Sequence, residues 1–237
     1  MGNADRTSPF RLARPLAGAG SLWIACAVAI ALASELGRPS GIDLIHPTFS
    51  ELIFTTLGAR LVGVSMVMLS FASICIMFAL IACLAPTGRL DRMLIGVWSG
   101  ALVVAAIFPP TPVGTPAVWY DTLHRYAALV GFVCLPLAGI RLARRFRTHA
   151  WWRRSATVVR ACSTVSLLGI AAFVSTFVPT GQPVWLIGAR QYSGITERLA
   201  LASNIALLAT LAAAVFSASR RRQPASMWGS TPQATTG

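Results

Sequence analysis

Lysine is absent from this sequence, because all 20 basic residues are arginine. This absence excludes chemistry that needs a lysine side chain, such as a Schiff base or a phosphate-binding P-loop. Charge is scarce as well, since 11% of the 237 residues are charged, against roughly 25% in an ordinary soluble domain. The low charge excludes a normal water-exposed surface.

Cysteine patterns that hold metals or disulfide frameworks are also lacking. The five cysteines lie within apolar stretches, and none of them forms a CxxC pair or a ligand pair with histidine. We expect them to be small buried hydrophobic residues. The sequence therefore indicates no disulfide framework, and we predict no bound metal and no cofactor.

Apolar residues make up 55% of the chain, and the mean hydropathy is +0.67. In such a chain the net charge of +13 favours a membrane over nucleic acid as partner, since no nucleic-acid recognition motif accompanies it. A helix needs about 20 mainly apolar residues to cross a membrane. We identify six such stretches at 17–34, 61–84, 93–108, 126–140, 161–178 and 199–217. The sequence therefore predicts an all-α, polytopic membrane protein with a bundle of six transmembrane helices.

These stretches divide the chain into three parts. Residues 1–16 form a basic cytoplasmic arm, 17–217 the six-helix transmembrane domain, and 218–237 a polar cytoplasmic tail that we expect to be disordered. The third and fourth stretches are short, so their helices must include flanking residues. The first stretch resembles a signal peptide but is long enough to span, and we keep it as a helix. Gly96 and Gly100 form a GxxxG pattern, which allows close approach of another helix.

Arginine alternates between the connections of the predicted helices. The amino-terminal arm, the second and fourth connections and the carboxyl-terminal tail together hold 15 arginines and two acids, whereas the other three connections hold five of each. Loops rich in arginine face the cytoplasm in multi-pass proteins. The sequence therefore predicts a plasma-membrane protein with both termini in the cytoplasm.

The fourth connection is the most basic segment of the chain. Arginines near a membrane surface attract anionic lipid, each contributing about 1 kcal/mol. The residues predicted to contact anionic lipid are Arg144, Arg145, Arg147, Trp151, Trp152, Arg153 and Arg154. The alternative is that these arginines only set the topology and that the tryptophans anchor the segment at the interface.

Ionisable residues gather on the predicted outer face, which holds five of the seven acids and two of the three histidines. Asp121 and His124 are three residues apart, so they share one face of a helix. Charged groups at membrane depth pair with one another or line a wet cavity. The candidate ligand-binding residues are His46, Glu51, Asp121, His124, Glu197 and Arg198.

Three interpretations of this outer cluster remain open. Its members can pair with one another and tie helix ends together without any further role. They can instead line a pocket for a small molecule or a lipid headgroup. A third interpretation is metal-assisted hydrolysis, with His46, Asp121 and His124 as ligands and Glu51 as the base.

Several short motifs resemble those of a known family. They are His46-Pro-Thr-Phe-Ser-Glu51, Phe108-Pro-Pro-Thr111, His124 at the start of the fourth helix, Leu135-Pro-Leu-Ala138 and Gly194-Ile-Thr-Glu-Arg-Leu199. This pattern is similar to a bacterial family of six-helix membrane proteins, domain of unknown function 998, common in actinobacteria. The resemblance implies an integral membrane protein with six helices, and it implies no established reaction.

The sequence thus favours a non-enzymatic integral membrane protein. Its outer polar cluster is predicted to bind a lipid headgroup or a small ligand, or to support a partner protein. The expected partner of the whole chain is the lipid bilayer, with anionic lipid at the cytoplasmic face and no nucleic acid. The alternative is a membrane-embedded, metal-dependent hydrolase that uses His46, Asp121 and His124.

Overall fold

The structure is a computed structural model, and it describes residues 10–37, 49–54, 58–111, 116, 118–175 and 192–221. Six long helices and one short 3-10 helix make up these residues, and no strand occurs among them. The elements are α1 (Phe10–Leu36), η1 (Phe49–Phe54), α2 (Gly58–Ala82), α3 (Arg89–Ile107), α4 (Trp119–Arg147), α5 (Arg153–Ser175) and α7 (Ser193–Arg221). The all-helical prediction is confirmed.

Each of the six long helices is apolar and long enough to cross a membrane. The prediction that the third and fourth helices include flanking residues is confirmed, since α3 has 19 residues and α4 has 29. Helix α1 begins at Phe10, so residues 10–16 of the predicted arm are helical. Pro15 is the sixth residue of α1 and has no backbone N–H, so the helix lacks a hydrogen bond to the Arg11 carbonyl there and continues beyond it. The predicted disordered tail lies outside the described residues from residue 222 onward.

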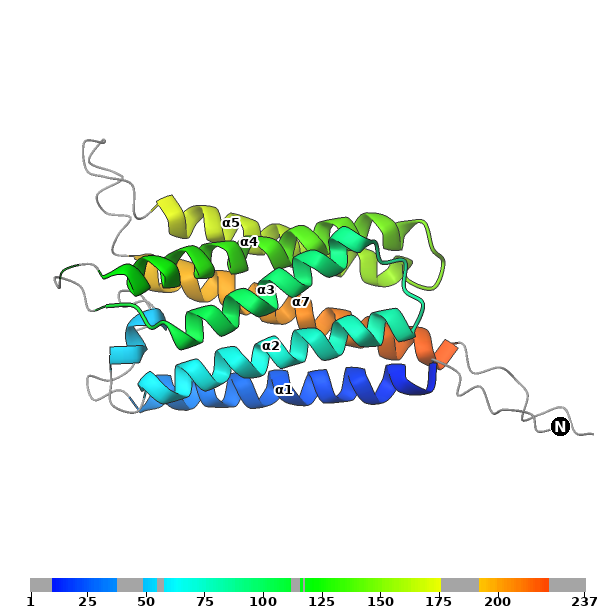
Figure 1. Ribbon diagram of the computed structural model, residues 1–237. Helices are drawn as coiled ribbons and strands as arrows, with labels where there is room; N and C mark the ends of the chain where they lie inside the picture. The colour runs from blue at the N-terminus through cyan, green and yellow to red at the C-terminus, as the bar shows by residue number, and fades with distance from the viewer. Residues whose placement is uncertain are drawn as a thin grey trace, which may run out of the picture.

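Consecutive helices run antiparallel and pack side by side (Figure 1). Each long helix contacts the next one in the sequence, from α1 through α2, α3, α4 and α5 to α7, and α7 also contacts α1. Helix α7 also contacts α2 and α4, so it lies partly inside this ring. Because the number of helices is even, the start of α1 and the end of α7 lie at the same end of the bundle (Figure 1).

Arginine is concentrated at the end of the bundle that holds these two termini, which we call the arginine-rich end. Its described arginines are Arg11, Arg14, Arg89, Arg92, Arg141, Arg144, Arg145, Arg147, Arg153, Arg154, Arg160 and Arg220. At the opposite end, which we call the balanced end, the described charged side chains are Arg60, Arg125, Arg198, Glu35, Asp121 and Glu197. The two ends of the bundle therefore differ in charge.

Polar side chains inside the bundle form hydrogen bonds within it. Trp98 donates from Nε1 to Ser73 Oγ at 2.8 Å, and Ser73 donates in turn to the carbonyl of Leu69 at 2.7 Å. Lipid offers no partner for such groups, so internal bonding of this kind is needed in a membrane. Phe146 and Trp152 stack with their centroids 4.9 Å apart and close the α4–α5 turn.

Glycine permits close helix contact at positions other than the predicted motif. A Cβ on Gly139 would lie 2.1 Å from Ser163 Oγ, and a Cβ on Gly20 would lie 2.8 Å from Ile76. At Gly96 and Gly100 a Cβ would meet nothing within 4 Å. The GxxxG pattern is therefore not used for a helix contact among the described residues, because Gly96 and Gly100 face away from the neighbouring helices.

Candidate functional site

Asp121 joins the start of α4 to the segment that follows α3. One carboxylate oxygen accepts a hydrogen bond from the backbone N–H of Thr111 at 3.1 Å. The other oxygen accepts from Arg125 Nε at 2.9 Å, one helical turn further along α4. The Asp121 side chain is 3% exposed, whereas that of Arg125 is 65% exposed. The carboxylate is therefore held inside the balanced end while its cationic partner remains outside.

The His124 side chain lies against carbonyl groups at the end of α3. Its Nδ1 lies 3.0 Å from the carbonyl oxygen of Ala105 and 2.8 Å from that of Phe108. The last carbonyls of a helix have no partner within the helix, and an Nδ1–H can donate to them. Asp121 and His124, which the sequence places on one helix face, therefore contact the chain around the end of α3 and tie it to α4.

A second group of polar residues joins α1, η1 and α7. Arg198 donates to the same Glu35 oxygen from Nε at 3.0 Å and from a terminal nitrogen at 2.5 Å, across 163 residues of sequence. Both side chains are largely buried, at 17% and 10% exposed. The neighbouring Glu197, 2% exposed, accepts a hydrogen bond from the backbone N–H of Phe49, the first residue of η1. These contacts hold η1 against α7.

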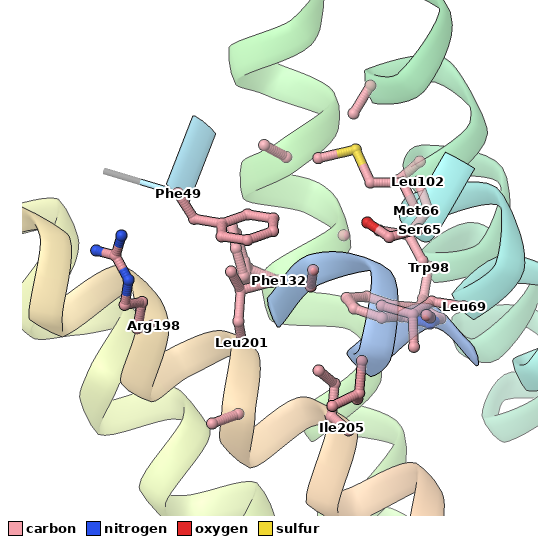
Figure 2. A pocket seen from close by; sticks show the side chains of 18 of the residues that line it. Phe49, Ser65, Met66, Leu69, Trp98, Leu102, Phe132, Arg198, Leu201 and Ile205 are labelled. Atoms are coloured by element: carbon pink, nitrogen blue, oxygen red, sulfur yellow. The ribbon is translucent and has the colours of Figure 1, made fainter. Parts of the chain in front are cut away.

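A cavity of about 260 Å³ extends from this second group into the bundle (Figure 2). Side chains of five helices, α1, α2, α3, α4 and α7, line it together with Phe49 of η1, and it is partly open to the outside of the bundle. Glu35, Arg198 and Phe49 lie towards the balanced end, and Trp98, Leu69 and Ile205 lie deeper. Ala27 and Glu35 of α1, which both line the cavity, are eight residue steps apart, so the cavity extends about 12 Å along α1 at 1.5 Å per residue.

The lining of this cavity is almost entirely apolar. Alanines at 27, 31, 101, 105, 127, 128 and 202 face it and leave the space that larger side chains would fill. Ser65 also lines it, but its hydroxyl donates to the carbonyl of Val62 at 2.7 Å. The Trp98 N–H likewise donates to Ser73 Oγ. Among the residues that the structure describes, the charged ones that line the cavity are Glu35 and Arg198.

The four candidate residues whose side chains the structure describes make their contacts in two groups. Asp121 and His124 lie in the α3–α4 group, whereas Glu197 and Arg198 lie in the group with Glu35. His46 and the side chain of Glu51 lie outside the described residues. Within the described part of the chain, no three residues among His, Cys, Asp and Glu are arranged to hold a metal ion.

Sequence reasoning missed Glu35 and the cavity itself. Glu35 was counted among the outer acids, but its partner is 163 residues away and no local pattern joins them. The alanines at spacing four, Ala27 with Ala31 and Ala101 with Ala105, are the signal that could have indicated facing helices with space between them.

The residues predicted to contact anionic lipid lie at the arginine-rich end. Arg144, Arg145, Arg147, Arg153 and Arg154 are exposed, and Trp151 is 44% exposed. Trp152 is 2% exposed and stacks on Phe146, so it packs the core and does not reach lipid. The prediction for Trp152 is therefore corrected, because its ring closes the α4–α5 turn from the inside.

The comparison with family models gives a match to "Protein of unknown function (DUF998)" over residues 3–214. The chain belongs to the DUF998 family. The matched range contains α1 to α5 and most of α7, so the family relationship covers the six-helix bundle and the cavity within it. The resemblance stated from the motifs is confirmed.

Comparisons with curated proteins and with solved structures give no match. The DUF998 description names no reaction and no ligand. The function of this DUF998 protein therefore has to be argued from its own residues.

Proposed function

We propose that this DUF998 protein is a non-enzymatic, multi-pass plasma-membrane protein that binds a single-chain amphiphile in the cavity at its balanced end. Both termini lie in the cytoplasm, so the mouth of the cavity faces the outside of the cell. The hydrocarbon chain occupies the apolar cavity, and the polar headgroup lies beside Glu35 and Arg198. The observation that carries this proposal is an apolar cavity whose charged residues form one ion pair at one end.

The size of the cavity supports a hydrocarbon occupant. Its lining is almost entirely apolar, so a hydrocarbon is a more favourable occupant than water. The volume lies just below the roughly 300–1,000 Å³ of sites for drug-sized molecules. One narrow chain therefore fits better than a bulky ring system.

The charge at the mouth supports a headgroup without net charge. Glu35 and Arg198 contribute one charge of each sign, and they are largely buried. Adding a net charge beside such a pair is unfavourable unless a second counter-charge is present. A zwitterionic or uncharged polar headgroup avoids this cost. Lysophosphatidylcholine is a probe of this class.

A tryptophan in the cavity provides a direct test. The purified protein is held in a rigid steroid detergent, which has no flexible chain to compete, and is titrated with lysophosphatidylcholine that carries a dibrominated acyl chain. Bromine quenches tryptophan fluorescence on contact, and Trp98 lines the cavity. We expect saturable quenching. Ala202→Leu, which adds three carbons to the lining, should weaken binding roughly tenfold or more, at about 0.8 kcal/mol per displaced methylene.

The matched control is Ala206→Leu, one turn further along α7. Ala206 is exposed and does not line the cavity, so this variant adds the same side chain to the outer surface of the helix. It should bind the probe as the original protein does. Equal binding by the Ala202→Leu protein, or quenching that does not saturate, would show that the amphiphile does not occupy the cavity.

A further inference from the structure

The arginine-rich end contains a recess that the cavity and the proposed amphiphile do not involve. It is a shallow, open surface recess lined by Arg141, Arg144, Arg145 and Thr148. All four residues belong to the last two turns of α4 or to the residue that follows it. A recess lined by three arginines is a basis for anion binding.

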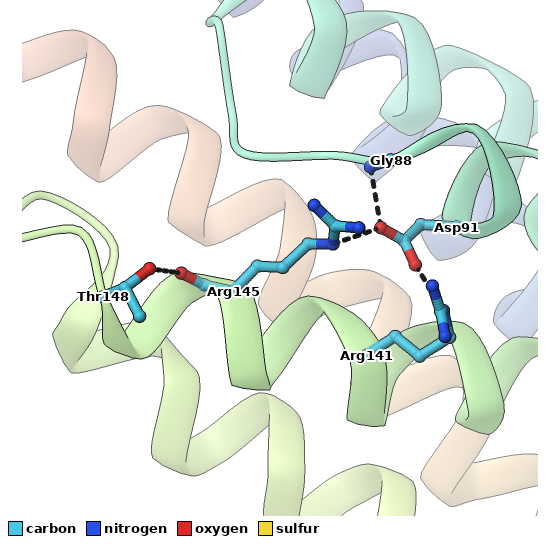
Figure 3. Close-up of polar contacts among 5 residues, drawn as sticks. All are labelled: Gly88, Asp91, Arg141, Arg145 and Thr148. Carbon is cyan, nitrogen blue, oxygen red and sulfur yellow. Dashed lines mark hydrogen bonds and ion pairs between the residues drawn. The ribbon is translucent and has the colours of Figure 1, made fainter.

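Asp91 organises two of these arginines from the neighbouring helix α3 (Figure 3). Arg141 Nε donates to one carboxylate oxygen at 2.8 Å, and Arg145 Nε lies 3.0 Å from the other. The same oxygen that meets Arg145 accepts the backbone N–H of Gly88 at 2.7 Å. Asp91 itself is 0% exposed. The Asp91 carboxylate therefore holds both guanidinium groups through their Nε atoms, on the side that faces α3.

This arrangement leaves donors and charge available. An arginine has five N–H donors, and the contact through Nε uses one of them. The Arg141 and Arg145 side chains are 39% and 45% exposed, so their guanidinium groups are open to solutes. The three arginines carry one positive charge each and the Asp91 carboxylate carries one negative charge, so the net charge at the recess is +2.

We propose that this recess binds a phosphate group. A planar guanidinium fork matches the geometry of phosphate oxygens, and Asp91 holds two such forks in place before the anion arrives. The phosphate can belong to the headgroup of an anionic phospholipid or to a free phosphate ion. The recess lies at the end of α4, a helix long and apolar enough to span a membrane, and Trp151 in the turn that follows is 44% exposed, which suits an interfacial position. This proposal holds for either orientation of the protein in the membrane.

The test compares two single variants that remove the same charge from the same end. Arg144→Gln removes a lining residue of the recess, whereas Arg154→Gln removes an exposed arginine on α5 that does not line it. The probes are short-chain phosphatidylglycerol, short-chain phosphatidylcholine and inorganic phosphate, and the affinity is measured by native mass spectrometry or thermophoresis. General attraction to the basic end is lost equally in both variants.

We expect Arg144→Gln to weaken phosphatidylglycerol binding about tenfold more than Arg154→Gln does, as for a charged hydrogen bond. The double variant Arg141→Gln/Arg144→Gln should weaken it further, with gel filtration used to check that it folds. Tighter binding of phosphatidylglycerol than of inorganic phosphate identifies a lipid as the source, and the reverse order identifies the free ion. Equal losses in the Arg144→Gln and Arg154→Gln proteins, or no binding of any phosphate probe, would overturn the proposal.

Discussion

Among the charged residues that the structure describes, Asp91 has the least contact with solvent, yet it meets two arginines and a backbone N–H. It lies in the first turn of α3 and accepts the N–H of Gly88, the residue before the helix. An acid at this position satisfies an unpaired donor and interacts favourably with the helix dipole. One side chain thus begins α3 and joins it to α4.

This geometry predicts that Asp91→Asn destabilises the protein. Loss of the carboxylate leaves the partners of a buried charge with weaker bonds, which should lower the free energy of unfolding by about 1–3 kcal/mol. The measurement is unfolding in mixed micelles of increasing denaturing detergent.

Asp121→Asn provides the comparison for this prediction. Its carboxylate also joins two segments, but its cationic partner Arg125 is 65% exposed, so its ion pair is weaker. The Asp121→Asn protein should lose clearly less stability than the Asp91→Asn protein. If both lose the same amount, the double arginine contact of Asp91 does not contribute as described.

The sequence predicts the charges of these residues but not their partners. Asp91 counts simply as one of two acids on the basic side, and Arg141 follows it by 50 residues. The fourth connection holds seven arginines. The rotation of α3 and α4 relative to each other decides which of them reaches Asp91. For Asp121 and His124 the spacing of three does indicate a shared face, because both lie on one helix.

Among the elements, η1 is the only described one that does not span the bundle. It covers the balanced end of the cavity, and Phe49 at its start lines that cavity. The acceptor for the first N–H of η1 is Glu197, from the other end of the sequence. The position of η1 therefore depends on a side chain of α7.

This dependence predicts that Glu197→Ala frees the start of η1. The amide of Phe49 should exchange its hydrogen about tenfold faster, as for loss of a hydrogen bond to a charged acceptor. Hydrogen–deuterium exchange followed by mass spectrometry of peptides that cover residues 49–54 measures the change. Thr196→Ala is the control, since the Thr196 hydroxyl bonds only to the preceding turn, at Tyr192 and Ser193. Unchanged exchange in the Glu197→Ala protein would contradict the role of Glu197.

Helix existence is predicted well by the sequence, and helix ends are not. All six apolar stretches are helices, because lipid forces every spanning segment to satisfy its own backbone. Helix α4 exceeds the predicted 126–140 at both ends because its polar flanks, including Asp121 and Arg147, remain helical. The short helix η1 was not predicted, since six residues contain no periodic signal of their own.

For the whole molecule, the two ends differ in charge as the positive-inside rule requires. We propose that the arginine-rich end is cytoplasmic, and a labelling experiment tests this. Ala150→Cys places a thiol in the exposed α4–α5 turn at that end, and Pro116→Cys places one at the balanced end, also at an exposed position.

A membrane-impermeant thiol reagent applied to intact cells should label the Pro116→Cys protein. It should label the Ala150→Cys protein only after the membrane is permeabilised. The original chain gives the background: four of its five cysteines lie within helices, and Cys83, directly after α2, is buried. The reverse pattern would place both termini outside the cell.

The class of the whole molecule follows from the sequence, whereas the shape of its interior does not. Six spans, an all-helical bundle and the DUF998 family are all indicated by composition and short motifs. The cavity arises because small side chains from four helices face one another, and this depends on the rotation of each helix. No single stretch of sequence carries that information.

The cavity also makes the protein sensitive to hydrostatic pressure. Pressure favours whichever state has the smaller volume, and a void that disappears on unfolding contributes directly to that difference. The cavity of about 260 Å³ lies towards the balanced end, so the volume change under pressure should be concentrated there. A hydrocarbon chain in the cavity fills this space, so the protein with bound amphiphile should show a smaller volume change on unfolding under pressure.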